Sequence, residues 1–433
     1  MTQTPVQRPG EDETTEIPAV GVHRADLGAD PDATTVLPPV PAQPGPHDDL
    51  EDELEGYDED DLELLDEEDE DFRPRKAGWV GRGIVWALLA WLVFAYPVNF
   101  LSPFDVGVAD VDIASRAVIF AIGGLSLNVL LGYAGQISLG HQAFVGLGAF
   151  TSAYIVTNLQ LSFWFAVVSA AVLGAVQAVL LGLVSLRLTG LYFALVTLAY
   201  GAFAEQTLFG ISALTGGEGG KPAPRPMGFE SGYAYYYLCL GFLVVVLWLD
   251  WRLTRSKAGR ALAALRENPR VASSYGINVR SYILVAFAVS GIFAGIAGSL
   301  TAHHDEIIVG SSFDFRLALL FVLMTVVGGL RNRVGVVIGS AFFALLEEGA
   351  FVEIVESVVT ALGFAPHFFE NVLGLPGEFV SLVVGPILLL LTLTLYPGGI
   401  GQQVAPIRGW LTGGRFDRHA GEVKEVEVTD VRA

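Results

Sequence analysis

Residues 162–186 have the sequence SFWFAVVSAAVLGAVQAVLLGLVSL, a run of 25 residues without a charged side chain. About twenty such residues, in a helix that rises about 1.5 Å per residue, cross a hydrocarbon core of about 30 Å. Apolar runs of similar length recur from Trp79 onward, and the mean hydropathy of the chain is +0.52. The sequence therefore predicts an all-α, polytopic membrane protein.

Ten candidate membrane spans follow from these runs. They are residues 80–101, 113–134, 137–157, 162–186, 189–212, 233–251, 281–302, 315–331, 334–350 and 379–397. Because the eighth and ninth are short, the predicted number of membrane helices is eight to ten. The transmembrane domain is expected at residues 79–400, with a C-terminal cytoplasmic tail at 401–433.

Lysine and arginine are concentrated in five clusters. These precede the first span, end the fourth, fill residues 252–280, separate the eighth span from the ninth, and follow the last. With ten spans, all five clusters fall on one side of the membrane, which the positive-inside rule assigns to the cytoplasm. Both termini are therefore predicted to be cytoplasmic.

The net charge of −21 arises from the N-terminal region. Residues 1–72 contain 24 of the 46 acidic residues and 2 of the 25 basic ones, so the rest of the chain is almost neutral. A segment this acidic and this poor in apolar residues cannot bury enough surface to fold. Residues 1–78 are predicted to be a disordered acidic tail, either without a function of its own or acting as a regulatory or partner-binding arm.

A basic segment that favours helix formation, residues 252–280, interrupts the apolar runs with seven Lys or Arg residues. Its pattern predicts two short helices, the first with a stripe of apolar side chains. The stripe consists of Ala261, Leu262 and Leu265. The predicted caps and stop are Ser256 for the first helix and Asn268, Pro269 and Gly276 for the second. The segment is either a knob that docks on a soluble partner or an ordinary amphipathic connector.

Residues 132–148 combine five glycines with polar side chains and predict a weak helix at membrane depth. Irregular backbone there is tolerated only where protein or a water-filled path satisfies it. The candidate path residues are Asn128, Gln136, Ser138, His141 and Gln142. Close packing through small residues is the alternative, and for His141 taken alone a hydrogen-bonded packing role is favoured. The pairs Gly291/Gly295 and Gly335/Gly339 also predict close helix packing.

The stretch at 124–144, GLSLNVLLGYAGQISLGHQAF, resembles the signature of LivM-type permeases, the membrane subunits of branched-chain amino-acid ABC importers. Four further stretches agree in order. They are GLYFALVTLA at 190–199, LTGG at 214–217, residues 256–278 and MTVVGGL at 324–330. The resemblance covers nearly all of residues 84–400 and implies an ABC importer permease fold.

The resemblance implies that residues 256–278 dock on an ABC ATPase subunit. The residues assigned to this contact are Arg260, Arg266, Glu267, Asn268, Pro269, Arg270, Ala272 and Gly276. Importer loops of this kind carry an acidic residue, two alanines and a glycine. Here RVASSYG at 270–276 keeps one alanine and the glycine, and Arg270 replaces the acid, which puts a salt bridge from that position in doubt.

The sequence contains no G-x-x-x-x-G-K-[ST] phosphate-binding motif, so ATP hydrolysis is expected on a partner chain. The chain itself is predicted to be a non-catalytic subunit without a cofactor or metal; His303, His304 and Asp305 form a weak candidate metal cluster. The resemblance implies a LivH-like second permease, two ABC ATPases and an extracytoplasmic binding protein as partners, with membrane lipid around the chain and no nucleic acid.

The cargo implied by the resemblance is a branched-chain amino acid that crosses the bacterial inner membrane into the cytoplasm; urea or amides are the alternative cargo. The rival class is a secondary transporter driven by an ion gradient, which usually needs an ionisable residue near mid-membrane. Glu205 is the candidate. Its position in the span at 189–212 places it close to the outer interface.

Overall fold

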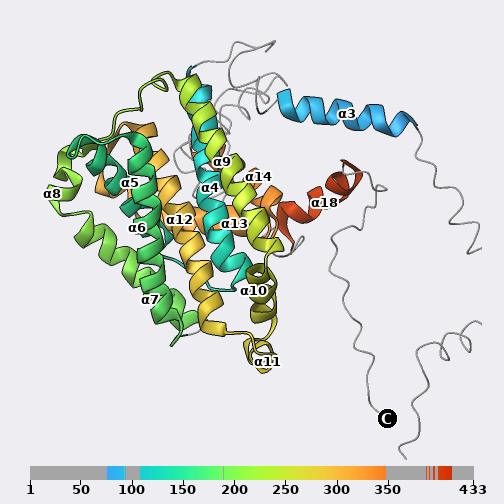
Figure 1. The fold of residues 1–433 in the computed structure, drawn as a ribbon. Coiled ribbons are helices and arrows are strands. Elements are labelled where there is room, and N and C mark those ends of the chain that lie inside the picture. Colours follow the sequence, from blue (N-terminus) through green and yellow to red (C-terminus); the bar gives the residue numbers. More distant parts are fainter. Residues whose placement is uncertain are drawn as a thin grey trace, which may run out of the picture. The chain divides into compact units, whose positions relative to one another are not determined.

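The structure is a computed structural model, and it describes residues 76–91, 93, 108–188, 190–347, 387, 390, 394 and 398–411. Element labels follow Figure 1 and begin at α3. The predicted acidic tail up to residue 75 and the chain from residue 412 lie outside the described residues. The predictions for those two segments stay predictions.

Helices account for nearly all of the described chain. The long and medium helices are α3 (Lys76–Ala90), α4 (Val108–Leu127), α5 (His141–Thr157), α6 (Phe163–Ser185), α7 (Leu191–Phe203), α9 (Gly232–Arg255), α12 (Val279–Asp305), α13 (Phe315–Gly328), α14 (Arg333–Glu347) and α18 (Gly399–Leu411). The short ones are α8 (Ser212–Thr215), α10 (Lys257–Glu267) and α11 (Pro269–Ser274), with 3-10 turns η5 (Gly217–Gly219) and η6 (Gly310–Phe313). The prediction of a largely helical protein is confirmed.

Two π-helical segments and one small sheet complete the description. The π-helical segments are η3 (Asn128–Tyr133), which continues α4, and η4 (Ala204–Leu208), which continues α7. Strands β1 (Lys221–Pro222) and β2 (Ile307–Ile308) pair antiparallel, with Lys221 opposite Ile308.

Four described helices are long and apolar enough to cross a membrane. They are Val111–Tyr133, which joins α4 to η3, and α6, α9 and α12. Helix α13 is apolar but shorter. The predicted count of eight to ten is not confirmed, because the spans at 80–101, 334–350 and 379–397 extend beyond the described residues.

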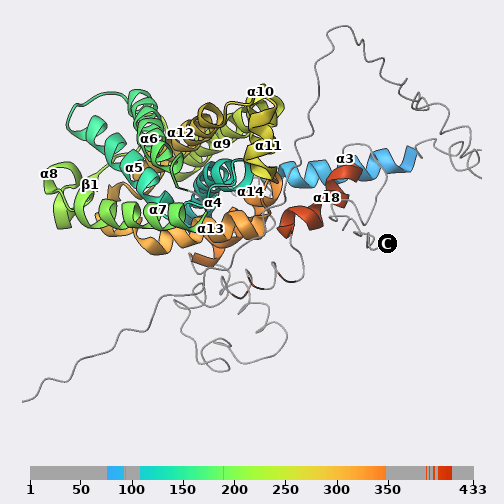
Figure 2. The same ribbon diagram turned by 90° about the horizontal axis from the view of Figure 1, so that it is seen from below.

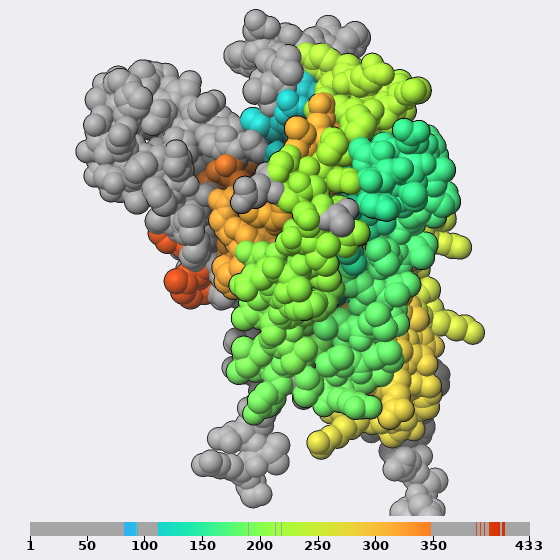
Figure 3. Space-filling model, turned by 90° about the vertical axis from the view of Figure 1, so that its left-hand side faces the viewer, coloured from blue at the N-terminus to red at the C-terminus, as the bar shows by residue number. Residues whose placement is uncertain are grey.

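Helix α6 exposes most of its large residues and buries many of its small ones. The exposed positions include Trp164, Val168, Val172, Val176 and Leu180, whereas Ala166, Ala170, Gly174 and Ala178 are buried. A helix of a soluble protein has the opposite pattern. Helix α7 likewise exposes Leu191, Tyr192 and Leu195, and the two helices lie side by side on the face shown in Figure 3. This outer surface suits contact with lipid, where small residues promote helix packing inside the bundle.

Helix α12 packs against α4, α5 and α6, and α4 in turn lies against α9, α13 and α14 (Figures 1 and 2). The contact between α6 and α12 depends on glycine. A Cβ atom at Gly291 would overlap the carbonyl oxygen of Gly174, and one at Gly295 would overlap that of Ala170. The predicted packing role of Gly291 and Gly295 is confirmed.

The second predicted glycine pair lies between α13 and α14. A Cβ atom at Gly335 would overlap the carbonyl oxygen of Gly328, and one at Gly339 would lie 2.8 Å from the carbonyl oxygen of Met324. These approaches leave no room for a larger residue, so this pair also packs as predicted.

Helix α18 runs across residue 400, where the transmembrane domain was predicted to end. Asn332 Nδ2 donates a hydrogen bond of 2.9 Å to the carbonyl oxygen of Gly401, which anchors α18 beside the start of α14. The chain after residue 400 therefore begins as a packed helix.

Candidate functional site

Helices α10 and α11 lie at the end of the bundle where α4 ends and α12 begins (Figure 1). The hydroxyl of Ser256 accepts a 3.3 Å hydrogen bond from the first turn of α10, and the Asn268 side chain accepts bonds of 3.0 and 3.2 Å from the first turn of α11. Pro269 occupies the first turn of α11, and Gly276 follows that helix with a φ of 80°. The predicted caps and stop are confirmed.

The apolar stripe of α10 is buried as predicted, with Ala261, Leu262 and Leu265 between 0% and 6% exposed. Of the predicted docking residues, Arg260, Glu267, Asn268, Pro269, Arg270 and Gly276 are exposed, and Arg266 is half-buried. Ala272 differs from this group because it is 3% exposed and lies on the inner side of α11, which packs on α12. Its side chain cannot provide a docking contact.

Two docking candidates were not predicted. Val271 is 50% exposed and Tyr275 is 83% exposed, and they lie four residues apart at α11 and its end. The i, i+4 spacing puts them on the same face. No signal in the sequence separated this pair from Ala272, because Ala272 was itself assigned to the docking contact.

Gly276 should tolerate Asn and resist Val. A non-glycine residue with positive φ costs about 1 kcal/mol or more, and Asn adopts this conformation more readily than β-branched residues do. No described heavy atom lies within 4 Å of the position that a Cβ would occupy. We expect Gly276→Val to lower binding of the predicted ATPase partner several-fold and Gly276→Asn to retain it, measured by co-purification. Equal binding by the two variants would show that the turn conformation does not matter.

Arg266 connects α10 to the end of η3. Its guanidinium donates a hydrogen bond to the carbonyl oxygen of Gly132, across 134 residues of sequence. Burial and the nearby charge of Arg331 lower the pKa of Arg266. The neighbouring Glu267 lies 3.7 Å from Arg331 in an exposed ion pair, which contributes about 0–1 kcal/mol.

Arg331, in the loop between α13 and α14, reaches the same region through its backbone. Its N–H donates a 2.9 Å hydrogen bond to Asn128 Oδ1, and its φ of 68° is uncommon for a residue other than glycine. Asn128 is fully buried at the first residue of η3. One loop therefore contacts both the predicted docking segment and the first candidate path residue.

Asp250 forms a second connection at this end of the bundle. Its Oδ2 accepts hydrogen bonds from the Tyr133 hydroxyl at 3.0 Å and from Arg333 Nε at 2.7 Å. Arg333 also donates to Thr254 Oγ1 at 2.7 Å. The Asp250 side chain is 0% exposed, so α9, η3 and α14 are joined by a buried charge-assisted hydrogen bond. Nothing in the local sequence of either residue indicates this pair.

Residues 134–140 interrupt the two helices on either side. Helix α5 begins at His141, so the predicted span at 137–157 starts too early. Gly135 has a φ of 68°, and the Leu139 N–H donates a 2.9 Å hydrogen bond to Thr197 Oγ1 of α7. Irregular backbone was predicted at this depth, and α7 satisfies part of it.

His141 packs as the favoured interpretation predicted. Its Nε2 lies 2.8 Å from Ser126 Oγ, and its ring meets Phe144 and Phe321 edge-on. The hydroxyl of Ser126 also donates to the carbonyl oxygen of Ser290 on α12 at 2.7 Å. His141 therefore helps to hold α4, α5 and α12 together.

The other candidate path residues keep both hypotheses open. Ser138 and Gln142 are 1% exposed, and Gln136 is half-buried with a 3.3 Å hydrogen bond from Ser185. The Ser138 hydroxyl and both amide atoms of Gln142 have no hydrogen-bond partner among the described residues. A buried polar atom without a partner costs about 1–3 kcal/mol. Asn128 Nδ2 and His141 Nδ1 also have no partner among the described residues, so all four residues offer a polar atom to a solute beside the broken backbone.

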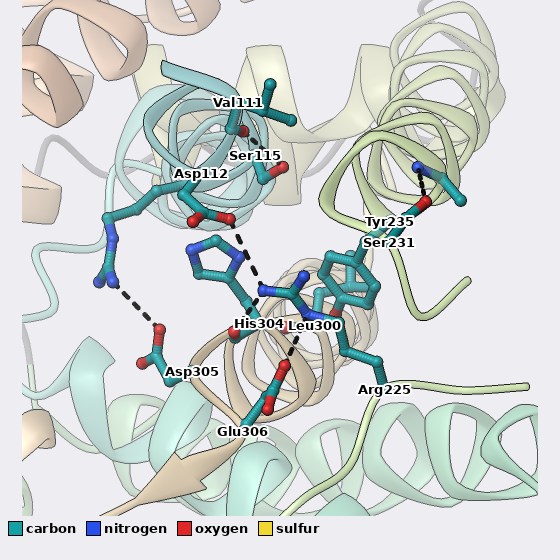
Figure 4. A network of polar contacts seen from close by, with 12 residues as sticks. Val111, Asp112, Ser115, Arg225, Ser231, Tyr235, Leu300, His304, Asp305 and Glu306 are labelled. Carbon is teal, nitrogen blue, oxygen red and sulfur yellow. Dashed lines mark hydrogen bonds and ion pairs between the residues drawn. The ribbon is translucent and has the colours of Figure 1, made fainter. Parts of the chain in front are cut away.

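At the opposite end of α4 and α12, Arg225 joins the two helices (Figure 4). Its guanidinium lies 3.6 Å from an Asp112 carboxylate oxygen and 3.2 Å from one of Glu306, and Arg116 lies 3.1 Å from Asp305. The loop that precedes α9 is therefore held against the end of α12 by ion pairs.

The weak metal cluster that was considered at 303–305 serves this structural role. His303 Nε2 lies 3.0 Å from Ser152 Oγ, its Nδ1 lies 2.7 Å from the carbonyl oxygen of Pro224, and the His304 ring stacks on Tyr235. Within the part of the chain that the structure describes, no three His, Cys, Asp or Glu residues are grouped so that they could hold a metal ion.

Comparison with known proteins identifies the family of the chain. The family described as branched-chain amino acid transport system/permease component matches residues 111–392. The chain belongs to this permease family. It is a multi-pass membrane protein of the LivM type, as its sequence predicted.

Two relatives are named high-affinity branched-chain amino acid transport system permease protein LivM. The one from Escherichia coli (strain K12) is 32% identical over 274 residues, which are 57% of this chain and 64% of the relative. The one from Salmonella typhimurium (strain LT2) is 32% identical over 289 residues, 60% of this chain and 67% of the relative. The chain thus spans about two thirds of the length of these relatives.

A third relative is named LivH. The probable branched-chain amino acid transport permease protein LivH of Methanocaldococcus jannaschii is 30% identical over 161 residues, 37% of this chain and 46% of the relative. No solved structure matches the chain.

Proposed function

We propose that this chain is the permease subunit of an ABC importer that carries branched-chain amino acids from an extracytoplasmic binding protein into the bacterial cytoplasm. The observation that carries the proposal is the exposed pair α10–α11, tied through Arg266 to the carbonyl of Gly132. The family match and the two LivM relatives support the cargo. Urea or amides are the alternative cargo.

The exposed side chains of α11 support the docking of a separate ATPase. The exposed Val271 and Tyr275 form a small apolar surface beside Arg270, and buried aromatic anchors beside an Arg are typical of strong protein contacts. Motion of α11 would pass first to the adjoining α10, whose Arg266 binds the Gly132 carbonyl of η3, and η3 is continuous with the broken segment at 134–140. ATP-driven movement at the docking surface therefore has a direct route to the candidate path.

The orientation follows from the distribution of charge. Seven Lys or Arg residues lie in 252–280 around α10 and α11, whereas the opposite end pairs its arginines with Asp112, Asp305 and Glu306. By the positive-inside rule, this distribution supports a cytoplasmic position for α10 and α11, in a chain that spans the inner membrane with both termini inside. The opposite end would face the binding protein, and a LivH-like subunit would form the other half of the pore.

An ion-gradient mechanism finds less support. Glu205, its candidate proton or sodium site, lies in η4, and η4 packs against η6, which follows the end of α12. That position is near the face opposite α10 and α11, away from mid-membrane. Coupling residues of secondary transporters usually lie deeper.

The direct test is reconstitution with a LivH-like permease and two ATPases in vesicles, with the binding protein outside. We expect uptake of labelled leucine that requires internal ATP and the external binding protein. Uptake driven by a proton or sodium gradient without the ATPases would overturn the proposal. Uptake of urea or an amide alone, still driven by ATP, would change the cargo and keep the mechanism.

Tyr275→Ala tests the docking surface. We expect the affinity for the ATPase to fall at least about tenfold, because aromatic anchors at the centre of an interface contribute about 1.4 kcal/mol or more. The thermal unfolding temperature of the isolated chain should not change, since Tyr275 is 83% exposed. Met227→Ala is the matched control, because Met227 is 94% exposed in the loop at the opposite end. Equal affinities of the two variants would argue against docking at α11.

A further inference from the structure

A groove of about 550 Å³ lies between the end of α9 and the facing part of α12. Both helices pack on α4, and between them the groove stays open in the described part of the chain. Its apolar lining includes Leu249 and Leu253 from α9 and Val289, Ile292 and Phe293 from α12. Because both helices are long and apolar enough to span the membrane, a lipid chain can reach this lining from the side.

Two arginines lie at the end of this groove that is nearest to α10. Arg255 lies 4.6 Å above the ring of Trp251, and Arg252 lies 5.8 Å from the ring centre of Trp248. Neither guanidinium forms an ion pair with a described residue. Tryptophan is enriched at the membrane interface, so the pairs mark the depth at which lipid headgroups lie.

An acidic phospholipid complements both parts of this groove. Its acyl chain fits the apolar lining, and its negatively charged phosphate diester can pair with the two guanidinium groups, which form no ion pair with a described residue. Arginine suits this contact because its planar group donates two parallel hydrogen bonds to phosphate oxygens. Basic pockets between membrane helices bind acidic headgroups in this manner.

We propose that the groove between α9 and α12 binds an acidic phospholipid, with its phosphate between Arg252 and Arg255. The site is separate from the candidate path, and it does not depend on which solute the chain carries. It adjoins Ser256, which caps α10, so bound lipid would hold the start of the docking segment in place. The assignment of the lipid to the cytoplasmic leaflet rests on the orientation proposed above, whereas the position of the site in the structure does not.

The experiment compares lipid retention by the purified full-length chain. After exchange into mixed phosphatidylglycerol and phosphatidylcholine, native mass spectrometry should show preferential retention of phosphatidylglycerol. We expect the Arg252→Gln/Arg255→Gln variant to bind phosphatidylglycerol about thirtyfold more weakly, as loss of two interfacial arginines implies. Lys257→Gln is the matched control: it removes one exposed charge at the same end, outside the groove lining.

A second variant tests the apolar part of the groove. Val289→Trp fills the lining without a change of charge, and it should displace the lipid while both arginines remain. Circular dichroism and size-exclusion chromatography establish that each variant is folded. Equal retention of the two lipids by the unmodified chain, or an equal loss in Lys257→Gln, would overturn the proposal. Exclusion of the lipid from the groove by a LivH-like subunit in the assembled complex would overturn it as well.

Discussion

Arg333→Met is expected to lower the free energy of unfolding by about 3–5 kcal/mol, because it leaves a buried carboxylate without a charged partner. The Asp250 side chain is 0% exposed, and its Oδ2 lies 2.7 Å from Arg333 Nε. Thermal unfolding in detergent micelles measures the loss. The Tyr133 hydroxyl keeps its own hydrogen bond to Asp250, so the variant should weaken the contact of α14 with α9 and leave that of η3 with α9.

The control is the neighbouring exposed pair. Arg331→Met removes a guanidinium that is 50% exposed and 3.7 Å from Glu267, and it should change the unfolding free energy by less than about 1 kcal/mol. The double variant Asp250→Asn/Arg333→Met removes both charges and should recover much of the stability that Arg333→Met loses. Strict additivity of the two single changes would show that the residues do not interact.

Gly291→Val should prevent α12 from packing on α6. Even a Cβ atom at this position would overlap the carbonyl oxygen of Gly174 and approach Ala178, and a backbone carbonyl cannot rotate away as a side chain can. Overpacking in a tight interior costs about 1–3 kcal/mol or more. We expect Gly291→Ala to lower the unfolding temperature clearly and Gly291→Val to abolish a single peak in size-exclusion chromatography.

Gly241 on α9 provides the matched control. No described heavy atom lies within 4 Å of the position that its Cβ would occupy, and it lies inside a membrane-spanning helix like Gly291. Gly241→Ala should leave stability unchanged or raise it by about 0.5–1 kcal/mol, because alanine favours the helix. A loss at Gly241 as large as that at Gly291 would mean that helix packing is not the cause.

The features that the sequence predicted well are those that neighbouring residues determine. The caps at Ser256 and Asn268 and the stop at Gly276 depend on hydrogen bonds and backbone angles within a few residues, so their residue types were sufficient. The irregular backbone predicted within residues 132–148 occurs only at 134–140, because α5 continues as a regular helix from His141, four residues after the predicted start of that span. The glycine pairs were predictable because close approach in membranes needs small residues.

Long-range partners were not predictable in this way. Arg266 and Gly132 are 134 residues apart, and Arg333 and Asp250 are 83 apart, so neither the local pattern nor the charge indicates that they meet. The motif placed Ala272 in the docking set, but the packing of α11 on α12 turned its side chain inward and left Tyr275 exposed. Which face of a short helix is available depends on what lies beneath it.

The sequence by itself determined that this chain spans a membrane, where its basic loop lies and which permease family it resembles, because hydropathy, charge and motif spacing are properties of contiguous residues. Only the tertiary structure decided that the docking segment is tied to η3, that Asp250 and Arg333 pair in the interior, and that two arginines without an ion pair among the described residues flank an apolar groove. These contacts arise when α4, α9, α12 and the loop before α14 pack together. Packing in three dimensions, and not order along the chain, brings their charges within bonding distance.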